Sequence, residues 1–274
     1  MSGNQNSVEY ALVLGASSGF GGATALRLAQ DGYNVIGVHF DRAATMPNAE
    51  KIISEIRALG REARFYNVNA ADLDKRDEIL DDLDKHPSGK PQIKVLLHSL
   101  AFGTLKPFVS FTEDKSLTKA QMEMTLDVMA HSLVYWTQAL VERGFLARKA
   151  RIFALTSSGS HAAIPYYGAV SAAKAAIESH IRQLAVELGP LEVSCTSIMA
   201  GVTDTPALRK IPGSVDMIDV ARRKNPRGRL TTPEDVAKVI SLLCQDGGEW
   251  INGGLVHVDG GEDIVNYVGQ NSNL

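Results

Sequence analysis

The sequence has few of the features that mark secreted, membrane-embedded or metal-binding proteins. Its 274 residues include only two cysteines, Cys195 and Cys244, which are far apart and lack metal-ligand spacing, as suits a reducing compartment. No apolar run approaches the ~20 residues that a membrane helix needs. The polar opening Met-Ser-Gly-Asn-Gln-Asn-Ser is unlike a secretion signal. We therefore expect a cytoplasmic protein with no metal and no membrane partner.

An excess of positive charge is also missing. The formal net charge is −3 and the pI is about 6.2, whereas a nucleic-acid-binding protein needs a basic face. We therefore expect no nucleic-acid partner. The length and the 45% hydrophobic content suit one large α/β domain, and no linker divides the chain. Residues 1–274 are thus predicted to form a single domain.

Short apolar runs alternate with longer amphipathic segments along the chain. Because each run is too brief for a helix and is bounded by turn residues, it predicts a buried parallel strand. The predicted strands are 10–14, 34–39, 63–68, 93–98, 151–156 and 192–198, and a last strand with its turn covers 254–261. The helices predicted between them follow residue 21, cover 51–59, 72–85, 118–143 and 167–189, and begin again at 232. This alternation predicts a Rossmann-type, doubly wound parallel sheet with helices on both faces and ligands at the carboxyl ends of its strands.

A glycine cluster with the pattern Gly-x3-Gly-x-Gly lies between the first strand and the first helix. Glycines let backbone N–H groups approach a pyrophosphate at a helix N-terminus, where the helix dipole also favours an anion. A glycine cluster alone is equally typical of a tight turn, but this location favours nucleotide binding. The candidate cofactor-binding residues here are Gly15, Ser17, Ser18, Gly19, Phe20 and Gly21.

The end of the second strand carries the groups that select a dinucleotide. An acidic side chain there binds the adenosine ribose 2′-hydroxyl, while an arginine accepts a 2′-phosphate. The sequence offers Asp41 and Arg42 side by side, so at least one is a solvated loop residue and the choice between NAD and NADP stays open. Further cofactor candidates at later strand ends are Asn67, Val68, Ser99, Ala101, Gly201, Thr203 and Thr205.

The stretch from Thr156 to Gly189 carries the candidate catalytic groups. Tyr167 and Lys174 are seven residues apart, which is two helical turns, so both face the same way. Tyr166 is rotated from Tyr167 by about 100°. Together with the upstream Ser157, the pair supplies a proton donor, a cation that lowers the phenol pKa and binds a sugar hydroxyl, and a donor to a developing oxyanion. This chemistry favours reduction over hydrolysis.

These motifs, with the closing His-Val-Asp-Gly-Gly, resemble in order and spacing the short-chain dehydrogenases/reductases over nearly the whole chain. Three positions depart from the usual pattern of that family. Val170 stands where most members have tyrosine, four residues before the lysine. His98-Ser-Leu-Ala replaces Asn-Asn-Ala-Gly after strand four, and the asparagine of the long helix is replaced near Met129. The departures fit either a degraded member or a specialised branch, and a structural role is expected for His98.

The Tyr-x6-Lys spacing, with His-Ser-Leu-Ala-Phe and Ala-Ile-Pro-Tyr-Tyr, resembles the enoyl-acyl-carrier-protein reductases. The resemblance implies NAD(P)H-dependent reduction of the 2,3 double bond of an enoyl thioester, as in fatty acid synthesis, with acyl carrier protein or CoA as the carrier. Hydride then goes to C3 while charge develops on the C1 oxygen, so the acid must lie farther out than in ketone reduction. Moving the tyrosine by three residues shifts it about 4.5 Å along the helix. The resemblance also implies a homotetramer built through the helices 118–143 and 167–189.

Two alternatives to this activity remain open. One is another short-chain reductase that acts on a ketone or on 2,4-dienoyl-CoA, and the other is a non-catalytic nucleotide sensor.

Residues 206–230 contain three prolines and few periodic apolar positions, which favours a mobile substrate lid. We call this segment the basic lid, because it contains Arg209, Lys210, Arg222, Arg223, Lys224, Arg227 and Arg229. These charges either steer an acidic carrier protein toward the site or are merely solvated.

Overall fold

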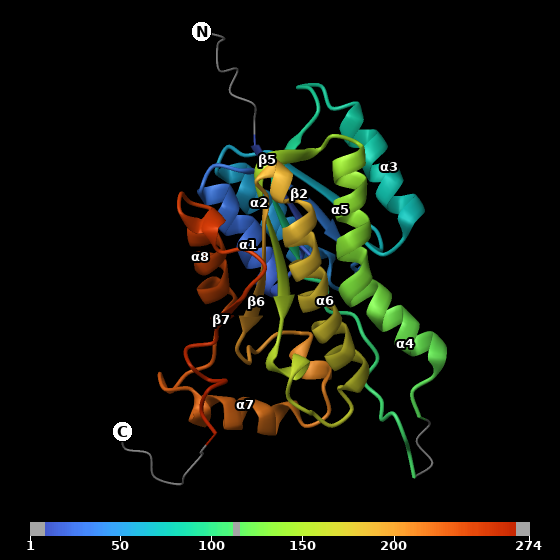
Figure 1. The fold of residues 1–274 in the computed structure, drawn as a ribbon, viewed down its shortest axis with the longest axis vertical. Coiled ribbons are helices and arrows are strands. Elements are labelled where there is room, and N and C mark those ends of the chain that lie inside the picture. The colour runs from blue at the N-terminus through green and yellow to red at the C-terminus, as the bar shows by residue number, and fades with distance from the viewer. Residues whose placement is uncertain (1–8, 112–115, 267–274) are drawn as a thin grey trace.

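The protein is built around one parallel sheet (Figure 1). The structure, a computed structural model, describes residues 9–111 and 116–266. Its strands lie in the order β3-β2-β1-β4-β5-β6-β7. They are β1 Glu9–Leu14, β2 Asn34–His39, β3 Ala63–Asn67, β4 Gln92–His98, β5 Leu146–Thr156, β6 Ser194–Ala200 and β7 Leu255–Val258. The predicted doubly wound sheet is confirmed, because β2 and β3 lie on one side of β1 while β4 to β7 lie on its other side.

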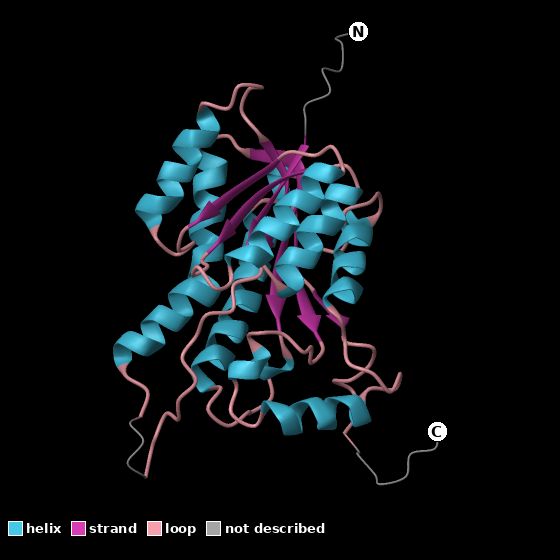
Figure 2. Cartoon of the chain, turned by 180° about the vertical axis from the view of Figure 1, so that it is seen from behind, coloured by secondary structure: helices cyan, strands magenta, loops and turns pink. Residues whose placement is uncertain are grey.

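Helices cover both faces of the sheet, as the sequence predicts. They are α1 Gly19–Gln30, α2 Met46–Ala58, α3 Leu73–Asp84, α4 Lys119–Leu126, α5 Ser132–Glu142, α6 Gly168–Glu187, α7 Ser214–Lys224 and α8 Pro233–Leu243. One apolar cluster joins one sheet face to α1, α2 and α8, and a larger one joins the other face to α3, α5 and α6. Figure 2 shows α7 lying across the end toward which the strands point.

Helix starts follow the local sequence signals. Thr118 and Gln121 form a reciprocal capping box at α4, and Thr232 and Asp235 form another at α8, where Pro233 occupies the first turn. Asp72 caps α3 by accepting a hydrogen bond from the Lys75 backbone N–H at 3.1 Å. These caps satisfy amides that otherwise lack an intrahelical acceptor, and they define where the connecting loops end.

The long helix predicted over 118–143 is interrupted. A π-helical segment, Asp127–His131, separates α4 from α5. The Ser132 hydroxyl donates to the Val128 carbonyl within this segment, and the His98 imidazole approaches the same hydroxyl oxygen at 2.8 Å. Such widening is a local backbone adjustment that leaves the apolar stripe intact, so hydrophobic periodicity does not predict it.

Several other boundaries differ from the sequence prediction. Helix α2 begins at Met46 rather than 51, with Pro47 in its first turn. Strand β5 begins at Leu146 rather than 151, with an irregular register before Arg151. Helix α6 begins at Gly168, so Tyr167 is its N-cap residue and Pro165 lies in the preceding turn. The segment 206–230 contains α7, which the sequence analysis missed because α7 buries only Ala221 and leaves its valines exposed.

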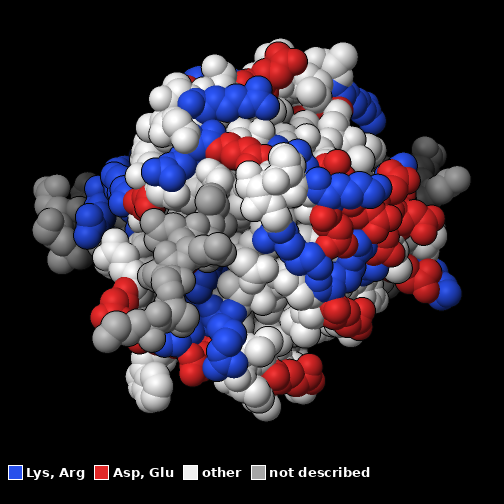
Figure 3. Space-filling model, turned by 90° about the horizontal axis from the view of Figure 1, so that it is seen from above, with Lys and Arg blue, Asp and Glu red and all other residues white. Residues whose placement is uncertain are grey.

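Charges are intermixed on the surface seen in Figure 3, where Lys and Arg side chains lie among Asp and Glu. Arg143, for example, lies 2.7 Å from Asp81 and 2.5 Å from Asp84 at the end of α3. In the described part of the chain, no helix combines the length and the apolar character needed to cross a bilayer.

Candidate active site

The glycine loop lies at the point where the strand order reverses. A Cβ at Gly15 would collide with the Ser99 carbonyl oxygen, and one at Gly21 would collide with the Gly15 carbonyl oxygen. Gly15 and Gly19 also adopt positive φ angles of 93° and 54°. Glycine is therefore required on steric and conformational grounds, because only it allows the loop to pack this closely against the end of β4.

The start of α1 fits an anionic group. Ser18 is the N-cap residue, yet its side chain makes no capping hydrogen bond, and the first turn carries no acidic residue. The amides of that turn have no acceptor within the helix, and the helix dipole favours negative charge there. Ser17 is buried, Ser18 is exposed and Phe20 packs against the core. This loop is suited to hold the pyrophosphate of NAD or NADP.

At the end of β2, Asp41 and Arg42 have different surroundings, although the sequence did not distinguish their roles. The Asp41 carboxylate lies 2.8 Å from His39 Nδ1, is 12% exposed and also hydrogen-bonds Ser17 of the glycine loop. Although burial opposes ionisation, the hydrogen bonds from Ser17, Thr45 and His39 lower the Asp41 pKa. Arg42 is exposed. Asp41 is therefore the side chain that faces the dinucleotide loop.

Two further loops border the same cradle. Asn67 exchanges hydrogen bonds with the Asp41 backbone at 2.8 and 2.9 Å, which ties the end of β3 to the end of β2. The methyl group of Thr205 would lie 3.7 Å from a Cβ on Gly19, so the loop after β6 borders the glycine loop. The other predicted residues lie at these strand ends: Val68 half-buried, Ser99 half-buried, Ala101 exposed, Gly201 half-buried and Thr203 buried.

The candidate catalytic residues come from β5, the turn after it and α6. Ser157 Oγ lies 3.5 Å from Tyr167 Oη, and Lys174 Nζ donates to the Leu155 carbonyl oxygen at 2.8 Å. Tyr167 is half-buried, whereas Lys174 is buried. The structure thus brings the serine and tyrosine together and places the lysine about two helical turns farther along, with its ammonium bonded to β5.

The electrostatics of this group are dominated by burial. Burial raises the pKa of Tyr167, and the hydrogen bond from Ser157 only partly opposes that rise. Burial also lowers the pKa of Lys174 to about 8. That Lys174 lowers the phenol pKa stays a prediction, and in this structure the Lys174 ammonium donates to the Leu155 carbonyl oxygen. Tyr167 therefore stays protonated at neutral pH and is able to donate a proton.

Sequence reasoning missed Glu178. Its carboxylate accepts a hydrogen bond from Thr156 Oγ1 at 2.6 Å, and its negative charge partly offsets the lowering of the Lys174 pKa. Glu178 lies four residues after Lys174, so helical spacing alone could have placed both on one face. His98, whose pKa is lowered to about 3 by burial, is neutral and packs as the expected structural residue.

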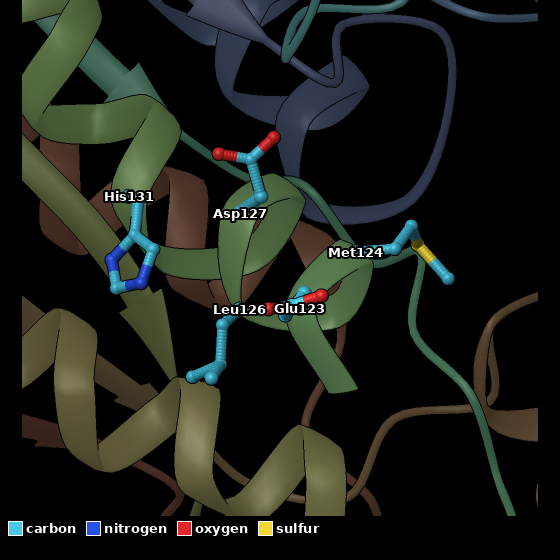
Figure 4. Close-up of a pocket in the computed structure, with 5 residues that line it drawn as sticks. All are labelled: Glu123, Met124, Leu126, Asp127 and His131. Atoms are coloured by element: carbon cyan, nitrogen blue, oxygen red, sulfur yellow. The ribbon is translucent and has the colours of Figure 1, made fainter. Parts of the chain in front are cut away.

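A surface hollow of about 390 Å³ lies beside α4 and the π-helical segment (Figure 4). It is lined by Glu123, Met124, Leu126, Asp127 and His131, all from α4 and the π-helical segment. None of the predicted cofactor or catalytic residues lines it. The candidate site is instead the open edge formed by the carboxyl ends of β1 to β6.

A glycine loop at the reversal point of a parallel sheet, beside a protonated tyrosine and a buried lysine, defines a nicotinamide-dependent oxidoreductase. The family described as enoyl-(acyl carrier protein) reductase matches residues 15–262. The chain belongs to this family, which is a branch of the short-chain dehydrogenases/reductases, and it is an oxidoreductase that uses NAD or NADP.

Individual relatives agree on the fold and differ in reaction. The chain is 25% identical to a probable tetrahydroxynaphthalene reductase of Zymoseptoria tritici, over 92% of this chain and 93% of the relative. It is 29% identical to the NADH-dependent enoyl-[acyl-carrier-protein] reductase of Aquifex aeolicus, over 66% of each chain. A crystal structure of that Aquifex enzyme superposes with a TM-score of 0.81 and 22% identity, covering 94% of this chain and 98% of the other.

Proposed function

We propose that the protein reduces the 2,3 double bond of an enoyl thioester, as an enoyl-acyl-carrier-protein reductase. The observation that carries the proposal is the location of the phenol. Tyr167 precedes Lys174 by seven residues and contacts Ser157, while buried Val170 occupies the position four residues before the lysine. The acid is thereby displaced along α6, as required when the hydride acceptor and the developing oxyanion are separate atoms.

The chain's own groups handle charge and protons at the substrate carbonyl. When bound, the nicotinamide supplies the hydride that adds to substrate C3. Negative charge then develops on the thioester oxygen, where the Tyr167 hydroxyl is the donor and Ser157 orients the phenol. Tyr167 stabilises the enolate by donating a hydrogen bond to its oxygen, and its proton then goes to C2, which saturates that carbon and restores the thioester carbonyl. The tyrosinate regains a proton from solvent.

Lys174 is assigned to the cofactor side of the site. Its buried amine is anchored to the Leu155 carbonyl and lies close enough to Glu178 for that carboxylate to favour its charged form. An ammonium in this location binds the hydroxyls of the nicotinamide ribose. The cofactor loops proposed above, from Gly15 through Thr205, would hold the remainder of NAD or NADP along the strand ends.

A carbonyl reductase is the second candidate, favoured by the similarity to the tetrahydroxynaphthalene reductase over 92% of the chain. A 2,4-dienoyl-CoA reductase and a non-catalytic nucleotide sensor are further alternatives. For the enoyl activity we also propose a homotetramer, with an acyl-carrier-protein-linked substrate steered by the basic lid. Lys210 and Arg227 contribute to this charge, whereas Arg209 is paired with Asp204 at 2.7 Å.

Substrate choice tests the proposal. Oxidation of NADH and of NADPH would be followed by absorbance with crotonyl-CoA and, separately, with acetoacetyl-CoA. We expect turnover with the enoyl substrate that is abolished in Tyr167→Phe and retained in Tyr166→Phe, the matched neighbour. Turnover with the ketone alone would establish the second candidate. Cofactor binding without oxidation by either substrate would favour the sensor.

A further inference from the structure

The Cδ1–Cε1 edge of the Tyr167 ring lies against Gly159, two residues after Ser157. A Cβ at Gly159 would lie 2.5 Å from Tyr167 Cε1 and 3.3 Å from Ser157 Oγ. Ordinary Cβ contacts are 3.4–4 Å, so no other residue fits without moving the ring. Gly159 has no positive φ angle, which means that glycine is required here for space rather than for backbone freedom.

A hydroxyl group ties this glycine to the helix that carries the lysine. Ser171 Oγ, in the first turn of α6, donates a short hydrogen bond to the Gly159 carbonyl oxygen. The backbone N–H of Ser171 donates to the Tyr167 carbonyl oxygen at 2.8 Å. Ser171 therefore bonds both to the backbone of Gly159, against which the phenol ring lies, and to the backbone of Tyr167 itself.

The chain enters Tyr167 through a strained turn. The Tyr167 N–H donates to the Ile164 carbonyl oxygen at 3.1 Å, with Pro165 and Tyr166 at the centre of the turn. Tyr166 has a φ of 63°, in the left-handed region that disfavours a residue with a Cβ. Such strain persists only where surrounding contacts over-determine the backbone, and here the neighbouring contacts are those of Tyr167.

We propose that Gly159 and Ser171 are positioning residues, which hold the Tyr167 phenol against the Ser157 hydroxyl. This inference rests on the proposed function, in which Tyr167 donates the proton. Gly159 sets the distance between Ser157 Oγ and Tyr167 Oη, because it leaves room for the phenol ring beside Ser157. Ser171 sets the relative placement of the loop after β5 and the start of α6, because its two bonds join them.

Two variants test the inference, each with a matched control. Gly159→Ala places a methyl group against the edge of the Tyr167 ring, while Gly189→Ala adds a methyl group where nothing lies within 4 Å. Ser171→Ala removes the bridging hydroxyl, while Ser171→Thr keeps it. Because a misplacement of about 1 Å can cost ~100-fold in rate, we expect kcat to fall roughly 100-fold in Gly159→Ala and ~10-fold in Ser171→Ala. The two controls should retain wild-type kcat.

A double-mutant cycle distinguishes positioning of the phenol from a purely structural role. If Gly159 acts by holding the phenol against the Ser157 hydroxyl, the losses of kcat in Gly159→Ala and in Ser157→Ala should not add in the double variant. The Michaelis constant for the cofactor should also stay within about twofold of wild type, because the glycine loop is untouched. Loss of cofactor affinity in step with kcat, or additive losses in the double variant, would overturn the inference. Ser171→Ala provides the same cycle should Gly159→Ala fail to fold.

The outcomes also distinguish this inference from the proposed function. Wild-type turnover in Tyr167→Phe would refute the proposed role of the phenol itself. A complete loss in Tyr167→Phe, combined with wild-type kcat in both Gly159→Ala and Ser171→Ala, would leave that role intact and refute only the positioning by Gly159 and Ser171.

Discussion

Ser157 Oγ and Tyr167 Oη lie 3.5 Å apart, although one follows β5 and the other caps α6. This hydrogen bond stabilises the phenolate and so lowers the Tyr167 pKa against the larger effect of burial. The proton donor of the site is therefore tuned by a neutral hydroxyl. Its strength as an acid depends on a contact between two segments that only the fold brings together.

Removing that hydroxyl should weaken the acid without removing it. In Ser157→Ala we expect the Tyr167 pKa to rise and kcat to fall about tenfold, because one donor near the oxyanion is lost. The pH–rate profile of kcat is the measurement, and its basic limb should move to higher pH. A profile identical to that of wild type would show that Ser157 is only a strand-end polar residue.

Lys174 should make the folded protein more stable as the pH rises from about 8 toward 10.5. Its pKa is lowered from 10.5 to about 8, so below pH 8 the fold must hold a buried ammonium that the unfolded chain holds in water. Lys174→Met should raise the free energy of unfolding at pH 7 by ~2 kcal/mol, after allowing for the lost bond to Leu155. Urea unfolding at pH 7 and pH 10 measures the gain, which should shrink at the higher pH.

An exposed lysine provides the control for this experiment. Lys51, whose side chain is 74% exposed, should give no comparable gain when changed to Met. Destabilisation by Lys174→Met at pH 7 would mean that the hydrogen bond to Leu155 outweighs the desolvation of the ammonium. Catalysis should be lost in Lys174→Met whichever way stability moves, because the ribose contact is removed.

The location of Asp41 predicts the cofactor preference. Its carboxylate faces the glycine loop and would repel a 2′-phosphate, so we expect NADH to be preferred over NADPH. Asp41→Ala should reduce that preference by roughly tenfold, equivalent to about 1.4 kcal/mol, as measured by the ratio of kcat/KM values. Arg42→Ala is the companion variant. A wild-type preference for NADPH that Arg42→Ala abolishes would reverse the assignment of the two side chains.

The basic lid predicts a carrier-specific effect. Reversing Arg222 and Arg223 to Glu should raise the apparent KM for an acyl-carrier-protein-linked substrate about tenfold and leave a CoA-linked substrate nearly unchanged. The difference should shrink at high salt, because the charges are exposed and screened. Lys51→Glu on α2, compared with Arg222→Glu alone, is the control for net charge. Equal changes for both substrates would show that these arginines are merely solvated.

Sequence patterns predicted the strands and most helices because buried strands and amphipathic helices leave periodic signals. The seven-residue spacing placed Tyr167 and Lys174 on one face of α6 for the same reason. Two features left no such signal. The π-helical segment Asp127–His131 keeps the apolar stripe of its neighbours, and α7 buries too little for its apolar positions to recur.

The sequence by itself determined the sheet, its helices, and which loops meet at the strand ends, because local periodicity and parallel β–α topology dictate these. Only the tertiary structure decided how individual side chains pair there. The Asp41 carboxylate lies toward Ser17, the Lys174 ammonium toward Leu155, and Gly159 against the edge of the Tyr167 ring. These contacts join residues from different elements or loops, and close packing selects them atom by atom, so no one-dimensional pattern records them.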